Sequence, residues 1–303
     1  MPIIRALGIL LNSYVDLSIE QFLSWEHRKE CPKTISFPSE YDGQTDLRIA
    51  CTQLNLSQSK QKKLVDEWAE LIPTLTDVEH IWFYSRVPQK LLNSVASLPK
   101  LRSLFIKWSG NGITDLVKLG DLKSLERLYI GSCTQLEALD SLKKLTKLKW
   151  LEMHELKKIN DITAIKSLKN LVGLTFTGGM FGKQFLTNID AISHLKNLEF
   201  LDFHRLKVES EDVSAIAKLK KLKYLDLPIY YPLSEFARIY AALPNCDHDI
   251  YAYRKTNEIC VKCMKGEMVL PMAKNKRQIC TVCSELKVKK LEDEFLGLVA
   301  SYS

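Results

Sequence analysis

The sequence contains no apolar run of the roughly 20 residues that a membrane-spanning helix needs. Near its start, the apolar run at residues 6–11 is interrupted by Gly8 and is short for the core of a signal peptide. The sequence also lacks a phosphate-binding glycine loop, a nucleophile elbow and a metal motif with an open coordination position. These absences predict a cytoplasmic, non-enzymatic protein with no membrane partner.

Hydrophobic residues make up 46% of the 303 residues and charged residues 26%, which is typical of a soluble globular protein. The chain has eight cysteines, of which four form two close pairs near the C-terminus. The others are widely spaced: Cys31, Cys51, Cys133 and Cys246. In a reducing cytoplasm we expect these four to be buried free thiols, whereas in a secreted protein Cys31 and Cys51 could form a disulfide.

The dominant feature is a pattern of four apolar residues that recurs along most of the chain. Within each copy, successive apolar residues are three, three and two positions apart. One copy runs from Leu168 to Phe176 and reads LKNLVGLTF. The third apolar residue of each copy recurs every 23 to 27 residues, at Ile81, Leu104, Leu128, Leu151, Leu174, Leu201 and Leu225. A nearly constant period of this length indicates a solenoid, in which stacked repeats bury one continuous core.

The pattern resembles the leucine-rich repeat family over roughly residues 74–230. The resemblance implies an α/β solenoid with a parallel sheet on its concave face. A second apolar set with spacing three, such as Ile113, Leu116 and Leu119, predicts short helices or 3₁₀ turns on the convex face. Only Cys133 matches the Asn or Cys that the family places after each strand, so we expect irregular turns. An array of helical repeats is the alternative.

The pattern divides the chain into three parts. Residues 1–73 form an α-rich capping region with helices at residues 14–30 and from Ser57 to Pro73, and strands at residues 34–37 and 51–56. Residues 74–253 form the solenoid, ending in a degenerate eighth strand at residues 249–253. Residues 254–303 form a small zinc-ribbon-like module and a C-terminal helix, whose apolar face should pack on the ribbon or on the last repeat.

The residues between the buried strand positions point to the open, concave face and are rich in aromatic rings. Aromatic clusters with a charged rim are typical of protein-binding surfaces. The sequence therefore predicts that a protein partner binds through Trp82, Tyr84, Phe105, Trp108, Tyr129, Trp150, His154, Phe200, His204 and Tyr224. The alternative is that the N-terminal region or the glycine-rich insertion at residues 176–189 covers these rings. That insertion either packs its aromatic residues on the convex side or contacts a partner.

Two carboxylate–imidazole pairs also lie on this face, Glu152 with His154 and Asp202 with His204. The two strands are two repeats apart, roughly 10 Å by strand spacing. The pairs are therefore too far apart to share a metal ion easily, and ordinary polar contacts are the favoured interpretation over a hydrolytic site.

Two Cys-x-x-Cys motifs, Cys260/Cys263 and Cys280/Cys283, are separated by 16 residues. Four thiolates at this spacing can hold a tetrahedral Zn²⁺, and the arrangement resembles a zinc ribbon whose hairpin arms would be residues 267–270 and 277–279. Four protein ligands leave no position for a reacting water, so the zinc would be structural. A redox-active dithiol pair is the alternative.

The positive charge of the chain is concentrated in this module. Residues 254–290 carry ten basic and three acidic side chains, a net +7 that equals the charge of the whole chain. A second basic feature is a row of lysines before the strands, namely Lys100, Lys123, Lys144, Lys169, Lys196 and Lys220. Contact of residues 254–290 and this row with nucleic acid is therefore an alternative function, although no aromatic ring for base stacking lies between Cys260 and Cys283. Leucine-rich repeat proteins can also act as inhibitors or immunity-type proteins.

Overall fold

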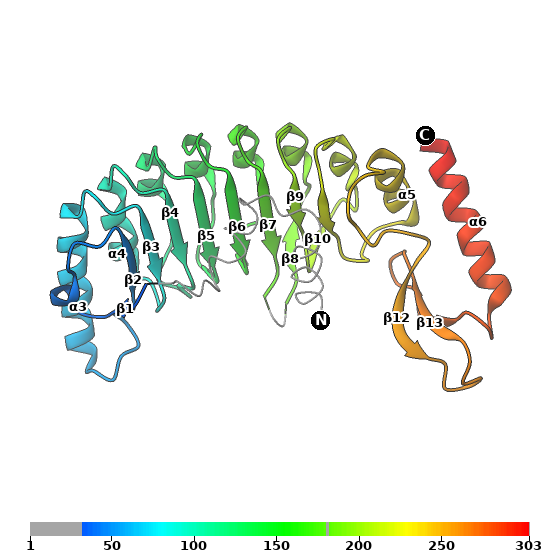
Figure 1. Ribbon diagram of the computed structural model, residues 1–303, viewed down its shortest axis with the longest axis horizontal. Coiled ribbons are helices and arrows are strands. Elements are labelled where there is room, and N and C mark those ends of the chain that lie inside the picture. The colour runs from blue at the N-terminus through cyan, green and yellow to red at the C-terminus, as the bar shows by residue number, and fades with distance from the viewer. Residues whose placement is uncertain (1–31, 180–181, 303) are drawn as a thin grey trace.

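The computed structural model describes residues 32–179 and 182–302, whose main body is a curved solenoid (Figure 1). Its concave side is a nine-stranded parallel sheet in which successive strands are neighbours, except that β8 and β10 lie outside it. The nine strands are β1 (Thr34–Ile35), β2 (Asp46–Ile49), β3 (His80–Phe83), β4 (Ser103–Ile106), β5 (Arg127–Gly131), β6 (Trp150–His154), β7 (Gly173–Thr177), β9 (Phe200–Asp202) and β11 (Tyr224–Asp226).

The predicted repeat is confirmed residue by residue by the register of the sheet. Ile81 pairs with Leu104, Leu104 with Leu128, and so on through Leu225, so the third apolar residue of every copy is aligned with the next. Leu104, Leu128 and Leu151 are fully buried. Burying each leucine stabilises the fold by roughly 1.5–3 kcal/mol, and this gain enforces the common register.

The convex side consists of short 3₁₀ turns, as the spacing-three pattern predicted. They begin near residue 72 and continue to the last repeat (Figure 1). Their bounds are η2 (Ile72–Thr74), η3 (Val95–Ser97), η4 (Val117–Asp121), η5 (Asp140–Lys144), η6 (Thr163–Ser167), η7 (Asp190–His194) and η8 (Ser214–Lys218), with the short helix α4 (Gln89–Ser94) preceding η3.

The turns after β5 and β6 are more regular than we expected from the lack of the family's Asn or Cys after most strands. Ser132 and Glu155 occupy equivalent positions in the left-handed region, with φ of 46° and 54°. Their backbone amides donate to the carbonyls of His154 and Thr177 in the next coil, at 2.8 and 3.0 Å. Backbone hydrogen bonds and buried apolar residues such as Leu156 therefore replace the side-chain ladder.

At the N-terminal end, the sheet starts earlier than the predicted solenoid boundary, because β1 and β2 extend it. The strand predicted at residues 34–37 is confirmed as the shorter β1, but the strand predicted at residues 51–56 is wrong. Leu47 and Ile49 supply the buried alternation in β2, whereas Gln53 has a φ of 61°, which interrupts an extended strand. The predicted helix is α3 (Gln58–Leu71), in which the Ser57 hydroxyl caps the Lys60 amide. A 3₁₀ turn, η1 (Pro38–Glu40), lies between β1 and β2, and the helix predicted at residues 14–30 lies outside the described residues.

The glycine-rich insertion forms a small structure of its own. Its β8 (Gln184–Leu186) pairs in parallel with β10 (Leu206–Val208) from the following repeat. Phe185 is 46% exposed, so this ring is not tucked into the core. The neighbouring Met180 and Phe181 lie outside the described residues.

The C-terminal end departs from the predicted eighth strand at residues 249–253. The eighth coil contributes only a bridge between Tyr224 and Asp247, and α5 (Leu233–Ala242) covers its convex side. Tyr253 instead starts β12 (Tyr253–Ile259), which pairs antiparallel with β13 (Glu267–Pro271), and β13 pairs with β14 (Ile279–Cys280). The hairpin of the module is thus confirmed, but with an additional strand.

The predicted C-terminal helix is α6 (Glu285–Tyr302), which packs on α5 of the last repeat (Figure 1). Its Phe295 is fully buried and meets the rings of Tyr240 and Tyr251 edge-on, at 5.4 and 5.5 Å. Among the described residues, no helix combines the length and the apolar character needed to cross a membrane.

Candidate recognition face and cysteine cluster

The structure places the ten predicted binding residues on or beside the concave face, but it buries four of them. Trp82 and Phe105 are 1% exposed, Trp150 is 2% and Phe200 is 4%. The expectation that these four rings are exposed is therefore wrong. They pack in two small clusters apart from the main core, and their burial favours the alternative in which the rings are covered within the molecule.

The remaining residues of the set are partly exposed, and two of them stack on buried rings. They are Tyr84, Trp108, Tyr129, His154, His204 and Tyr224. Phe105 stacks on Tyr129 with ring centroids 4.2 Å apart, and Phe200 stacks on Tyr224 at 4.7 Å with nearly parallel planes. The buried rings thus hold the partly exposed tyrosines in fixed orientations.

Tyr84 is held in a different way, between two cations. The Arg48 guanidinium and the Lys107 ammonium each lie 3.7 Å from the centre of its ring. A cation over an aromatic face is attracted by the ring quadrupole. Sequence reasoning did not find the contact with Arg48, because the strand that carries it was predicted at residues 51–56.

Only the first of the two predicted carboxylate–imidazole contacts forms between side chains, because the Asp202 carboxylate instead accepts from the His204 backbone amide at 2.8 Å. His154 contacts Glu152 on its own strand at 3.1 Å, and His204 lies 3.8 Å from Asp226 of the next strand. Burial, together with the neighbouring Asp226 carboxylate, raises the pKa of Asp202 to about 7. Within residues 32–179 and 182–302, these groups do not form a cluster that could hold a metal ion.

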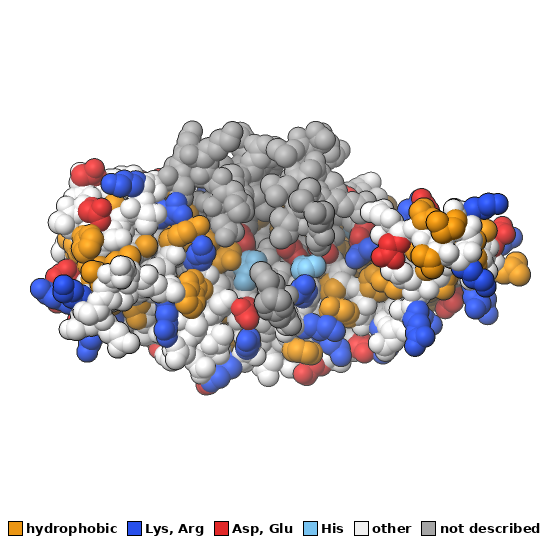
Figure 2. Space-filling view, turned by 90° about the horizontal axis from the view of Figure 1, so that it is seen from below, with side chains coloured by type: hydrophobic (Ala, Val, Ile, Leu, Met, Phe, Trp, Pro, Cys, Tyr) orange, Lys and Arg blue, Asp and Glu red, His pale blue; other side chains and the backbone are white. Residues whose placement is uncertain are grey.

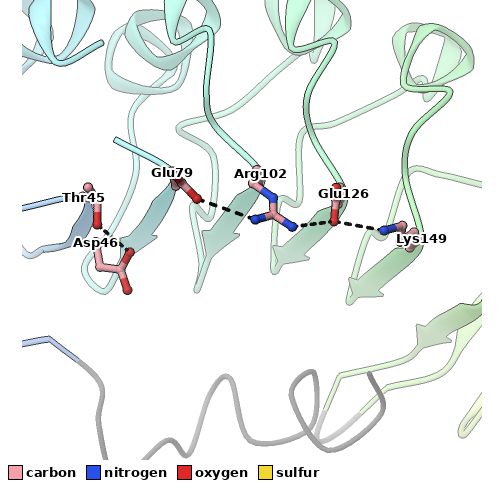
Figure 3. Close-up of polar contacts among 6 residues, drawn as sticks. All are labelled: Thr45, Asp46, Glu79, Arg102, Glu126 and Lys149. Carbon is pink, nitrogen blue, oxygen red and sulfur yellow. Dashed lines mark hydrogen bonds and ion pairs between the residues drawn. The ribbon is translucent and has the colours of Figure 1, made fainter. Parts of the chain in front are cut away.

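Charged side chains form an alternating row along the edge where the strands begin (Figure 3). Arg102 lies between Glu79 and Glu126, at 3.7 and 3.3 Å, and Glu126 also pairs with Lys149 at 3.3 Å. A hollow of about 510 Å³ lies beside Glu126 and Lys149. These pairs are partly exposed, so each contributes little stability by itself, typically below about 1 kcal/mol.

Several lysines of the predicted row have local partners, which supports a structural, solvated edge. Lys100 pairs with Asp77 at 2.7 Å. Lys123 and Lys220 donate to the carbonyl oxygens of Gly120 and Ala242, at 2.6 and 3.1 Å. Lys123 and Lys220 thus cap carbonyl groups near the ends of η4 and α5.

The four C-terminal cysteines converge as the motif spacing predicted, and all four sulfur atoms lie within 4.8 Å of one another. Cys260 Sγ is 3.9 Å from Cys283 Sγ, and Cys263 Sγ is 3.6 Å from Cys280 Sγ. A tetrahedral metal with bonds of about 2.3 Å to sulfur would hold the sulfur atoms about 3.8 Å apart. The cluster is therefore compatible with a metal site.

Backbone amides favour the thiolate form on the first motif. The amides of Gly266 and Lys265 lower the pKa of Cys263 to about 6, and the amides of Cys263 and Lys262 lower the pKa of Cys260. Hydrogen bonding to the neighbouring thiols instead raises the pKa of Cys283 to about 12. A bound cation would allow all four sulfur atoms to be thiolates at once.

The single cysteines within the described residues are buried and free, as expected for a reducing environment. They are Cys51, Cys133 and Cys246. Burial raises the pKa of each thiol to about 12, which makes them unreactive. Cys31 lies outside the described residues.

A family model described as leucine-rich repeats in two copies matches residues 99–144, which include β4 and β5. The fold is a leucine-rich-repeat solenoid. This fold suggests a protein-interaction module. A search of curated proteins finds no match.

A solved structure of a leucine-rich repeat protein shares the solenoid fold. A leucine-rich repeat protein of Leptospira interrogans superposes with a TM-score of 0.51 at 18% identity, covering 71% of this chain and 57% of that one. An internalin of Listeria monocytogenes gives 0.46 at 19% identity, covering 66% of this chain and 58% of the other. The match thus spans less than two thirds of the length of either structure.

Proposed function

We propose that this chain is a non-enzymatic recognition protein that binds a protein partner on the concave face of its repeats. The observation that supports this best is the set of tyrosines held rigidly at that face. Tyr224 stacks on Phe200, and Tyr84 lies between Arg48 and Lys107. Tyrosine offers a large, amphipathic contact area at a low entropic cost when it is held in place before binding.

In this proposal the partly exposed rings contact the partner and the buried rings support them. Trp82, Phe105, Trp150 and Phe200 then act indirectly, because each is at most 4% exposed. The carboxylates of Asp202 and Asp226 lie beside Tyr224, so a partner that presents a basic side chain at this end of the face would fit their charge.

The test is capture of the partner from the native host, followed by measurement of its affinity for purified variants. We expect Tyr84→Ala combined with Tyr224→Ala to weaken binding at least about tenfold, which is typical of hot-spot tyrosines. Phe37→Ala is the matched control, because Phe37 is 46% exposed and lies on the loop after β1, not on a strand of the sheet. Unchanged affinity of the double variant would refute the proposed role of the concave face.

The second part of the proposal is that the four-cysteine cluster holds a structural Zn²⁺, and that the protein works in the cytoplasm. The sulfur–sulfur distances fit tetrahedral zinc, and the buried free thiols fit a reducing compartment. Elemental analysis of the purified chain should find a single Zn²⁺, which Cys263→Ser should remove. Absence of zinc from the wild-type chain, with a reversible disulfide in its place, would favour the redox alternative.

A further inference from the structure

Exposed apolar side chains are concentrated around the cysteine cluster. Of the ten large hydrophobic residues that are well exposed in the described chain, five lie within residues 259–286. We call these five the apolar tip, and they are Ile259, Val261, Met264, Val282 and Leu286, with exposures of 54%, 91%, 73%, 54% and 84%. A cluster of this kind on a small module requires an explanation, whereas isolated exposed residues do not.

The cysteine cluster brings these residues together from four segments, beginning with Ile259 at the end of β12. Val261 and Met264 lie on the turn between β12 and β13, Val282 lies between β14 and α6, and Leu286 lies in the first turn of α6. The two turns are in direct contact, because a Cβ on Gly266 would lie 3.1 Å from the Val282 Cβ. The residues of the two turns therefore lie close to the sulfur atoms, and Ile259 and Leu286 adjoin these turns along the chain.

Exposed lysines flank the apolar tip. Within the part of the chain that the structure describes, none of them forms an ion pair: Lys262, Lys265, Lys287, Lys289 and Lys290. By contrast, Lys255 of the same module pairs with Glu267 at 2.9 Å. Figure 2 shows basic and hydrophobic side chains interspersed at the end of the molecule formed by this module.

The combination of aliphatic and lysine side chains narrows the class of partner. Protein interfaces are enriched in aromatic residues, methionine and arginine and depleted in lysine, and of these favoured residues the apolar tip contains only Met264. Single-stranded nucleic acid is bound with aromatic rings, of which the segment between the cysteine motifs has none. An anionic lipid surface accepts both features, because aliphatic side chains enter the headgroup region while lysines bind the lipid phosphates and carboxylates.

We propose that the apolar tip and its lysines bind peripherally to an anionic membrane surface. Val261, Met264 and Val282 lie on exposed turns, so they can enter a lipid surface without a preformed complementary pocket. This proposal revises the expectation of no membrane partner, which was based on the absence of a spanning segment. It is independent of the concave face, which lies on a different part of the molecule (Figure 1).

The test is co-sedimentation of the full-length, zinc-containing protein with vesicles. We expect binding to phosphatidylcholine vesicles that contain phosphatidylserine, and much weaker binding to phosphatidylcholine alone. Val261→Asp with Met264→Asp should lower the partition coefficient at least about tenfold, because two apolar insertions are lost. Lys287→Gln and Lys289→Gln should each lower it about fivefold. Val117→Asp is the matched control, since Val117 is 60% exposed but lies on the convex face.

Zinc content and far-UV circular dichroism of each variant must equal those of the wild type, which separates loss of the contact from loss of the fold. The proposal is overturned if the wild type binds neither vesicle, if it binds both equally, or if the Val261/Met264 variant binds as the wild type does. It is also overturned if the tip instead mediates self-association or binds an oligonucleotide. The first would show as a dimer that the Val261/Met264 variant breaks, and the second as oligonucleotide binding that only the lysine variants weaken.

Discussion

Gly173 and Trp150 offer the sharpest test of the packing on the concave face. Gly173 lies on β7 directly beside Trp150 of β6, and a Cβ at this position would lie 1.8 Å from Trp150 Cε3. No side-chain adjustment of a few tenths of an ångström relieves such an overlap. The substitution Gly173→Ala must therefore displace the Trp150 ring, which is 2% exposed and packs 6.2 Å from Phe200.

The expected cost follows from two opposing effects. Forcing extra volume into a packed site typically costs about 1–3 kcal/mol, whereas replacing glycine stabilises by about 0.4–1 kcal/mol through the unfolded chain. We therefore expect Gly173→Ala to lower the free energy of unfolding by about 1–2 kcal/mol. In a Trp150→Ala background the overlap is gone, so the same substitution should be neutral or stabilising.

Urea denaturation followed by circular dichroism measures all four members of this double-mutant cycle. The control is Gly182→Ala, because a Cβ on Gly182 would meet nothing within 4 Å. If Trp150→Ala is too unstable to measure, Trp150→Leu serves as the background. The packing account is refuted if Gly173→Ala costs the same free energy with and without the tryptophan ring, because the two sites would then be uncoupled.

Three further predictions concern the module, the acidic concave face and α6. A zinc chelator should remove hydrogen-exchange protection from β12 to β14 while leaving the nine-stranded sheet protected, because the metal would stabilise the fold of the module alone. Simultaneous loss of protection in the module and in the nine-stranded sheet would contradict this. Asp202 has a folded pKa of about 7, above its unfolded value, so wild-type stability should fall as pH rises from about 4 to 7. Asp202→Asn should remove this pH dependence, and the variant should be more stable than the wild type at pH 8 by at most about 4 kcal/mol. Urea denaturation at several pH values measures this, and an equal pH dependence of the two proteins would disprove the raised pKa of Asp202. Gly297→Ala, where the added Cβ meets nothing, should raise the free energy of unfolding by about 0.5–1 kcal/mol through helix propensity, and a loss of stability would indicate an unseen contact.

The sheet and its register could be predicted from the sequence because buried leucines impose them. Each misplaced repeat would expose several leucines, so the period alone fixes which residues pair. The N-terminal end had no such constraint. Leu47 and Ile49 in the true strand, and Leu54 and Leu56 in the predicted one, show the same alternation. The left-handed Gln53 that excludes the second choice leaves no mark in the sequence.

The concave face was predicted less completely than the cysteine cluster. The cysteine cluster could be located because four ligands at fixed spacing must converge on one point. The burial of Trp82 or Phe105 depends on what packs over the face, and a period-two pattern specifies only the direction of a side chain. β12 was missed because its residues, such as Lys255 and Glu258, are polar and mostly exposed, so no apolar alternation marks the strand.

The row of ion pairs at the strand edge (Figure 3) limits how this solenoid can change in length. Its charges alternate coil by coil from Glu79 to Lys149, so neighbouring coils always present opposite signs. Deleting a single coil within this stretch would place two like charges side by side, whereas deleting two coils would restore the alternation. A change by an odd number of repeats in this half of the protein would therefore lose surface ion pairs, each typically worth about 1 kcal/mol or less, whereas a change by an even number would keep them.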